Sequence, residues 1–230
     1  MGQNYNNNVH VYDPSNVVHS ATLPTAVVVG QTVLVWASSA RDTGFPLVNG
    51  FCTDNLGNTY TKLQDVVVNS EHNTDAVLWY TVVTVAGTCT VTVPNAKDVG
   101  LSVICLVGAD TTSPIDVSMQ HIMPDPLSNP GPNPLEGTLT GVTSASHSIY
   151  VFWANEETFG DLDYFTPQGS VTTVELDLTH KDGWGAWPNA ASGNVVCGAH
   201  FGSNPTLRSL VAAVSVKDAV AKKGLLLAAA

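Results

Sequence analysis

The chain has 230 residues, of which 44% are hydrophobic and only 12% charged, and its formal net charge is −11. This length is enough for a real hydrophobic core without metal or disulfide staples, in one large domain or two small ones. The negative charge excludes nucleic acid as a partner, because the chain cannot neutralise a phosphate backbone. No apolar run is long enough for a membrane span, and MGQNYNNN has no secretory signal pattern.

Runs of apolar or alternating residues, separated by Gly, Pro, Asn and Asp, predict a succession of β-strands after a polar arm or edge segment at 1–14. The apolar run at 31–38 predicts a strand buried on both faces. The run at 87–93 alternates with period two, which is typical of a half-buried strand. Further strands are expected at 16–23, 51–53, 59–63, 76–83, 101–107, 115–122, 148–154, 171–178, 194–201 and 209–218.

The polar segment 54–58, with the sequence DNLGN, predicts a tight turn between two of these strands. Asp and Asn bond their own backbone in turns, and we expect Gly57 to adopt a positive φ. Five prolines between 124 and 134 predict an extended segment, either a crossover at one end of the fold or an interdomain linker.

The second half of the chain weakly repeats the first. The run at 148–154 is similar in sequence pattern to that at 32–37, and the run at 209–218 is similar to that at 101–107. We therefore predict an all-β protein, a two-sheet antiparallel β-sandwich of jelly-roll type with roughly ten strands around one core. Its organisation would be an N-terminal arm (1–14), a single sandwich domain (15–218) containing the proline-rich crossover, and a C-terminal tail (219–230).

Three short motifs carry a family resemblance. They are a D-x-x-G-N-x-Y turn, a W-Y strand and a G-x-D-x-x-x-P turn, formed by Asp54, Gly57, Asn58 and Tyr60, by Trp79 and Tyr80, and by Gly108, Asp110 and Pro114. In this order they resemble a jelly-roll-like β-sandwich domain of phage structural proteins and bacterial surface or adhesion proteins. The resemblance implies a role in display, adhesion or decoration, and it implies no catalytic residues.

The residues offer little for catalysis. No nucleophile-elbow, zinc-protease or phosphate-loop motif is present, and seven histidines are scattered singly. We therefore predict that the protein is not an enzyme. A hydrolase or lyase whose active site has no recognisable motif is a third hypothesis, beside the two functions given at the end of this section. Four widely spaced cysteines, Cys52, Cys89, Cys105 and Cys197, are expected to be buried free thiols or to form one or two disulfides.

Two segments are candidate ligand sites. The acidic run 155–163 offers Glu156, Glu157, Asp161 and Asp163, which would either bind Ca²⁺, the one candidate cofactor, or form a solvated loop. The segment 182–188 carries two tryptophans among Gly and Pro, which predicts a loop. Its indoles would either stack on a sugar ring or plug one end of the sandwich. The candidate carbohydrate-binding residues are Trp184, Trp187, His180 and Asp182.

The tail contains Leu225, Leu226 and Leu227, which would either fold back on their own domain or insert into a neighbouring subunit as an assembly contact. We therefore expect a structural virion protein, of capsid-decorating, tail or fibre type. It would bind its own copies or other virion proteins and would be assembled in the host cytoplasm. The alternative is a carbohydrate-binding or adhesion module that binds a surface glycan through its end loops, outside the cell or on its surface.

Overall fold

The computed structural model is an all-β protein built from antiparallel sheets, as the sequence predicts. It describes residues 3–13, 19–39, 46–68, 74–94, 98–122, 134–155, 162–177, 182–202 and 209–219. Within these ranges there are sixteen strands and one short helical turn, and no helix is long and apolar enough to cross a membrane.

Eight strands and the helical turn come from the first half of the chain. They are β1 (Asn4–Asp13), β2 (His19–Thr22), β3 (Thr32–Ser39), α1 (Pro46–Asn49), β4 (Thr53–Asp54), β5 (Thr61–Val68), β6 (Thr74–Val82), β7 (Thr90–Val93) and β8 (Val99–Val107). The second half supplies β9 (Ile115–Ile122), β10 (Leu135–Val142), β11 (Ser148–Asn155), β12 (Leu162–Thr166), β13 (Thr172–Asp177), β14 (Asp182–Trp187), β15 (Gly193–Phe201) and β16 (Ser209–Val216).

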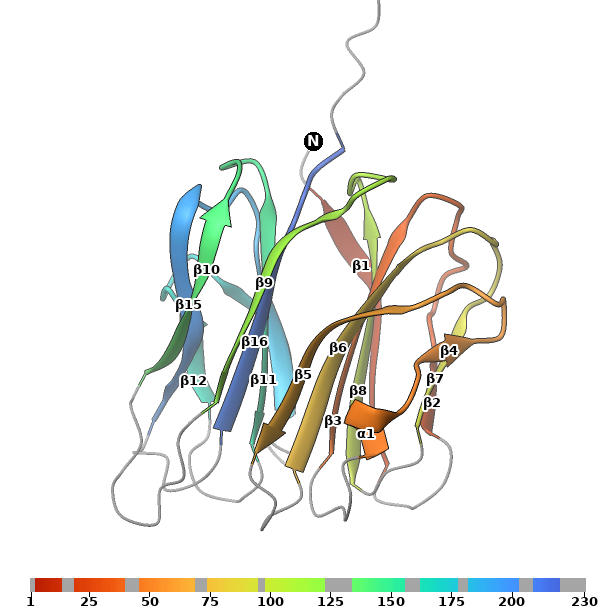
Figure 1. Cartoon of the computed structure of the whole chain (residues 1–230), viewed down its shortest axis with the longest axis horizontal. Helices are drawn as coiled ribbons and strands as arrows, with labels where there is room; N and C mark the ends of the chain where they lie inside the picture. The colour runs from red at the N-terminus through yellow and green to blue at the C-terminus, as the bar shows by residue number, and fades with distance from the viewer. Residues whose placement is uncertain are drawn as a thin grey trace, which may run out of the picture.

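These strands form four sheets that are stacked in four layers (Figure 1). In the first half, β1-β8-β3-β6-β5 form a five-stranded sheet and β2-β7-β4 a three-stranded one. In the second half, β9-β16-β11-β14-β13 and β10-β15-β12 do the same. The two five-stranded sheets face each other in the middle, and the small sheets lie outside them.

The predicted repeat is therefore a repeat of topology. Adding eight to each strand number of the first half gives the strand order of the second half, in both the large and the small sheet. The similar runs at 32–37 and 148–154 correspond to β3 and β11, and those at 101–107 and 209–218 correspond to β8 and β16. Three details of the prediction were wrong: the described residues form sixteen strands instead of about ten, four sheets instead of two, and three buried clusters in place of one core.

The β-sandwich is confirmed, whereas its jelly-roll type stays a prediction. In the first half β1 pairs with β8, β2 with β7 and β3 with β6, which is the nested pairing expected of a jelly roll. However, β5 pairs with β6 at the edge of the large sheet. The N-terminal segment, predicted as an arm or an edge segment, is the edge strand β1. Residues 123–133 of the proline-rich segment lie outside the described residues.

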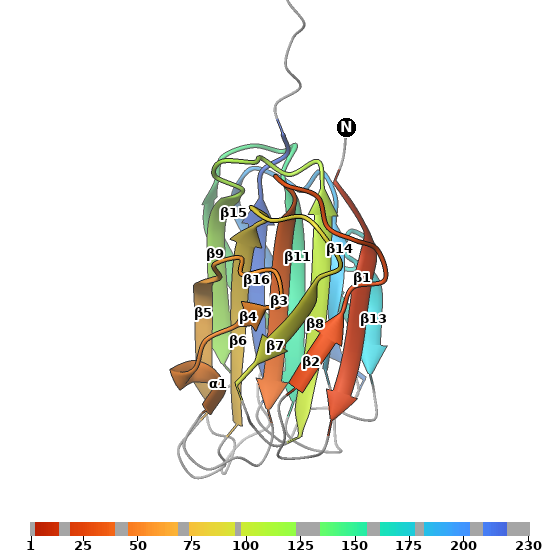
Figure 2. The same cartoon turned by 90° about the vertical axis from the view of Figure 1, so that its right-hand side faces the viewer.

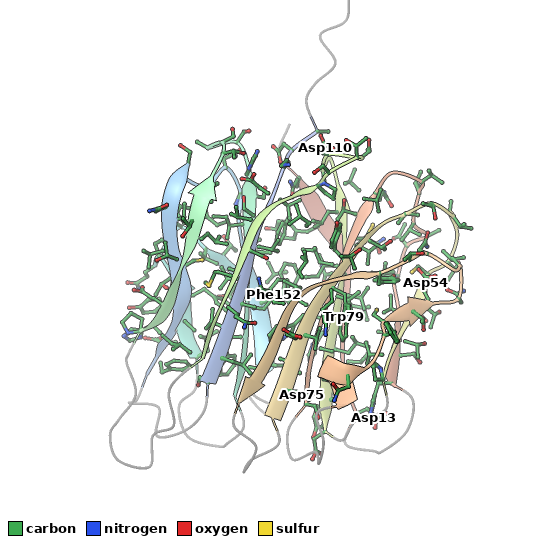
Figure 3. All side chains as sticks on the ribbon, viewed as in Figure 1. Asp13, Asp54, Asp75, Trp79, Asp110 and Phe152 are labelled. Carbon is green, nitrogen blue, oxygen red and sulfur yellow. The ribbon has the colours of Figure 1, made fainter. Side chains whose placement is uncertain are left out.

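The central layers explain why their strands are apolar on both faces. Every residue of β3 and of β16 is buried, because each large sheet is covered on one side by the other large sheet and on the other side by a small one. Trp36 of β3 and Phe152 of β11 meet in the middle as stacked rings, with centroids 5.4 Å apart (Figure 3, where Phe152 is labelled).

The N-terminal residues tie the two halves together on the flank formed by β1 (Figure 2). The Gln3 side chain donates a hydrogen bond to the Val216 carbonyl (2.9 Å) and accepts one from the Tyr150 hydroxyl (2.8 Å). Tyr5 of β1 packs edge-on against Tyr150 and Trp184. The first strand therefore belongs to the first half by its pairing and also fixes the position of the second half.

The four cysteines are free thiols, and all are buried. Burial raises the pKa of Cys89 and of Cys105 to about 11 and that of Cys197 to about 12. Such thiols remain protonated at neutral pH and act as small apolar side chains. Of the two alternatives left open by the sequence, the structure shows the first.

The predicted turn at 54–58 is present, and Gly57 has a φ of 80°. The Asp54 carboxylate holds it closed by accepting hydrogen bonds from the backbone N–H groups of Leu56 (2.9 Å) and Asn58 (3.0 Å). It also accepts hydrogen bonds from the Asn58 amide (2.9 Å) and the Tyr60 hydroxyl (3.1 Å). The D-x-x-G-N-x-Y motif is therefore a polar hub organised by one carboxylate.

Replacement of Asp54 by Asn should reduce the stability of this hub in a pH-dependent way. Burial raises the pKa of Asp54, but hydrogen bonds from Asn58, Tyr60 and Leu56 outweigh burial and lower it below the ordinary value of 3.8. The stabilisation is therefore present above pH 3.8 and is lost as the pH falls through the lower folded value. At neutral pH we expect Asp54→Asn to lower the free energy of unfolding by about 1–2 kcal/mol.

Urea unfolding of both proteins across this pH range measures the difference. The difference in the free energy of unfolding between the two proteins should become smaller as the pH falls. A difference that stays constant at all pH values would contradict the assignment of the hub to the ionised carboxylate.

Candidate functional site: a buried acid–base cluster between the two halves

The tryptophan segment is a strand, and the prediction of a loop was wrong. β14 lies inside the large sheet of the second half, between β13 and β11. Trp184 is only 1% exposed and packs in the central cluster, and Asp182, on the same face, is buried as well. Trp187 is half-buried on the opposite face, against the outer cluster of that half. His180 lies outside the described residues.

The glycines that suggested a loop serve a different purpose in the strand. A Cβ atom added to Gly185 would lie 2.8 Å from both Phe165 Cδ2 and Val171 Cγ1, and 3.0 Å from the Thr172 carbonyl oxygen. Glycine is therefore required at residue 185 for close packing against Phe165 of the small sheet and against the start of β13, not for a turn. The structure does not bring Trp184 and Trp187 together as a platform for a sugar ring.

Substitution Gly185→Ala tests this close packing. We expect it to lower the free energy of unfolding by about 1–3 kcal/mol, because the new methyl group has to displace Phe165 or Val171 in a filled core. Gly202→Ala is the matched control, since an added Cβ there meets nothing within 4 Å. Denaturant unfolding compares the two, and equal midpoints would contradict the packing argument.

The buried Asp182 carboxylate points from the second half into a polar cluster of the first half. Its Oδ1 atom lies 3.5 Å from Nε2 of His10 on β1. Its Oδ2 atom accepts a hydrogen bond of 3.5 Å from the hydroxyl of Ser38 on β3. His10 Nδ1 in turn lies 3.0 Å from Oγ of Ser102 on β8. Gly100 leaves the space for this carboxylate, because a Cβ there would collide with it.

The topological repeat shows that the fold does not require this polar cluster. Strand registers define equivalent positions, since Ser38 opposes Ala76 and Gly100 while Ala154 opposes Asp182 and Leu210. The second half thus has its own counterpart of the cluster on the other flank. The residues there are Gln120, Ala154, Leu210 and Ala212, with Ala76 from the first half in place of Asp182. Three of the four polar residues of the cluster have alanine counterparts.

The cluster contains the residue types of a Ser-His-Asp triad but not its accessibility. Ser102 is fully buried and Asp182 nearly so, so that a substrate has no access to the hydroxyl. The nitrogen that faces Ser102 is Nδ1, and Nε2 faces the carboxylate, the reverse of the usual triad. What the arrangement can do is hold a histidine and a carboxyl group together across the junction of the two halves.

This cluster was not predicted from the sequence. His10 and Ser102 come from strands that pair in register, but Asp182 lies 172 positions from His10 and in the other half. One signal was available: Ser38 and Ser102 are polar residues inside strands predicted to be apolar. A serine on a strand buried on both faces requires a hydrogen-bond partner from another layer.

The other histidines with described side chains also lie beside aspartates. His19 Nδ1 is 3.4 Å from Asp13, His147 Nδ1 is 3.1 Å from Asp116, and His200 Nδ1 is 3.5 Å from Asp163. Burial raises the pKa of Asp116, but hydrogen bonds from Thr143 and the nearby His147 outweigh it and lower that pKa. The four histidines whose side chains are described, each single in the sequence, are therefore paired with aspartates in space.

Only one of the four candidate calcium ligands can be located. Asp163 is an exposed residue of β12 beside His200, which also stacks on Tyr164 with ring centroids 4.4 Å apart. Glu156, Glu157 and Asp161 lie outside the described residues. In the described part of the chain, no three His, Cys, Asp or Glu side chains gather in a way that could hold a metal ion.

The buried contact between His10 and Asp182 predicts a characteristic set of stability changes. His10→Ala leaves the Asp182 carboxylate buried without its histidine and should cost about 3–5 kcal/mol. The double change His10→Gln with Asp182→Ala, which copies Gln120 and Ala76 at the counterpart, should cost clearly less. Gln120→Ala is the control, with an expected effect of about 0.5 kcal/mol or less. A double variant less stable than His10→Ala would contradict the role assigned to the pair.

Comparison with known proteins gave no match: no protein-family model fits the chain, and neither the curated proteins nor the solved structures contain a similar one. The resemblance to phage structural and bacterial adhesion domains therefore stays a prediction.

Proposed function

We propose that the protein is a non-enzymatic structural component of a virion, of capsid-decorating, tail or fibre type, which acts through contacts with its own copies or with other virion proteins. The observation that supports this proposal is that packed side chains fill the interior. Both faces of both large sheets are filled by packing, and the one Ser-His-Asp grouping we describe is sealed inside.

A molecule built in this way offers neighbours its strand ends, its sheet edges and the outer faces of its small sheets. The four layers give it a rigid body, because the central cluster joins the two halves along the whole length of the strands (Figure 1). Rigid sandwiches with short surface connections suit repeated contacts, in which each copy has to present the same surface.

The test is localisation on particles. Antibodies raised against the purified protein should label intact virions from the source of the chain, as seen by immunogold electron microscopy, at regular positions. Preimmune serum is the control. Virions that carry no label, together with protein found only outside the cell or on its surface, would contradict the proposal. A glycan array probed with the same protein tests the alternative, a carbohydrate-binding or adhesion module, which also stays a prediction.

A further inference from the structure

An apolar patch lies at one end of the first half. Of the six large hydrophobic residues that are exposed in the described part of the chain, four belong to it. They are Val28 (57% exposed), Val29 (61%), Val85 (46%) and Val107 (45%), and we call them the end patch. Exposed apolar groups that gather at one place mark an interaction surface more often than single ones do.

Backbone pairing brings these valines to the same end. Val27 and Gly87 form an isolated bridge, and the Gly30 N–H donates a hydrogen bond of 2.9 Å to the Val83 carbonyl, so that the segments 28–29 and 84–86 are neighbours. Leu106 opposes Thr32 in the ladder between β8 and β3, which places Val107 beside this connection.

The C-terminal segment leaves the body beside the end patch. The Ala219 N–H donates a hydrogen bond of 2.7 Å to the carbonyl of Gly108, the residue after Val107. The Asp110 N–H donates one of 2.9 Å to the Lys217 carbonyl. The last described residues continue the direction of β16 and point outward from the body (Figure 1). Beyond them the sequence contains Lys222, Lys223 and the three leucines 225–227.

Charge at this end complements the tail. Asp110 is a half-buried residue of the connection between the two halves, and it lies close to Lys217, near the end of the described chain (Figure 3). Backbone and side-chain hydrogen bonds from Ser113 and Thr112 lower its pKa, so that it is ionised at neutral pH. The first charged residues of the tail are two lysines, which would meet this carboxylate on the way to the patch.

We propose that Leu225, Leu226 and Leu227 of one copy cover the end patch of a second copy, and that the exchange is reciprocal. This inference rests on the proposed function, since it names the contact between copies. Five residues, 220–224, separate Ala219 from Leu225, and six extended steps carry the chain about 20 Å outward from its own end. Because Ala219, from which the tail continues, and the patch lie at the same end, mutual exchange closes a two-fold pair and leaves no open chain of copies.

Three proteins test the exchange by analytical ultracentrifugation over a range of concentrations. The full chain should form dimers. A chain truncated after Ala219 keeps every described contact and should be a folded monomer. Val29→Asn weakens the patch and should raise the dimer dissociation constant about tenfold or more. Val196→Asn is the control, because Val196 is also an exposed valine (46%) but lies on β15 of the other half, and this variant should dimerise normally.

A mixing experiment separates exchange from docking of the tail on its own chain. The truncated protein has an intact patch, and the Val29→Asn protein has an intact tail. Together they should form a mixed pair more readily than either forms a pair with itself. A full chain that stays monomeric, or a truncated chain that still dimerises, would overturn the proposal. Immunogold labelling of virions that carry only the truncated protein separates the two proposals. If the truncated protein is still incorporated, the tail contact is wrong and the proposed function stands.

Discussion

The face-to-face packing of the two large sheets is the constraint on which the rest of the structure depends. Trp36 and Phe152 occupy the same place in equivalent strands and stack on each other at the centre. Such a ring pair contributes about 0.5–1.5 kcal/mol beyond its buried area. Because the two large sheets cover one face of each other, the opposite face of each has to be covered by another element. The small sheets provide it, and four layers are the result.

The same constraint explains which elements could be predicted. Strands β3, β8, β11 and β16 are buried on both faces, so that their sequences are long apolar runs that read as strands without further information. The small outer sheets leave weaker traces. β4 has only two residues, and β10 contains two glycines among its threonines. Such segments pair because of the layer beneath them, a tertiary cause that local patterns do not contain.

β14 shows how a local rule can mislead. Glycine and tryptophan in the order DGWGAW are typical of a loop, yet the backbone is extended and paired on both sides. Gly185 is glycine because Phe165 of the small sheet and Val171, the residue before β13, both approach it closely. The side chains that dictate this choice come from other segments of the chain, so their effect on residue 185 is visible only in the folded protein. The polar cluster was hidden for the same reason, because its carboxylate comes from the other half.

The cluster around Asp182 also bears on how two similar halves make one defined molecule. Two sandwiches of the same topology, joined through apolar faces, could slide or exchange partners at little cost, because apolar packing has no direction. A buried carboxylate changes this balance. Any arrangement that separates Asp182 from His10 leaves a buried carboxyl group without its histidine partner, which costs more than an imperfect apolar contact. The counterpart position on the other flank has Ala76 in place of Asp182. The flank with Asp182 therefore fixes how the two halves lie against each other, and the other flank contributes apolar packing. The polar cluster thus makes the two halves non-equivalent, and it does so where their central sheets meet.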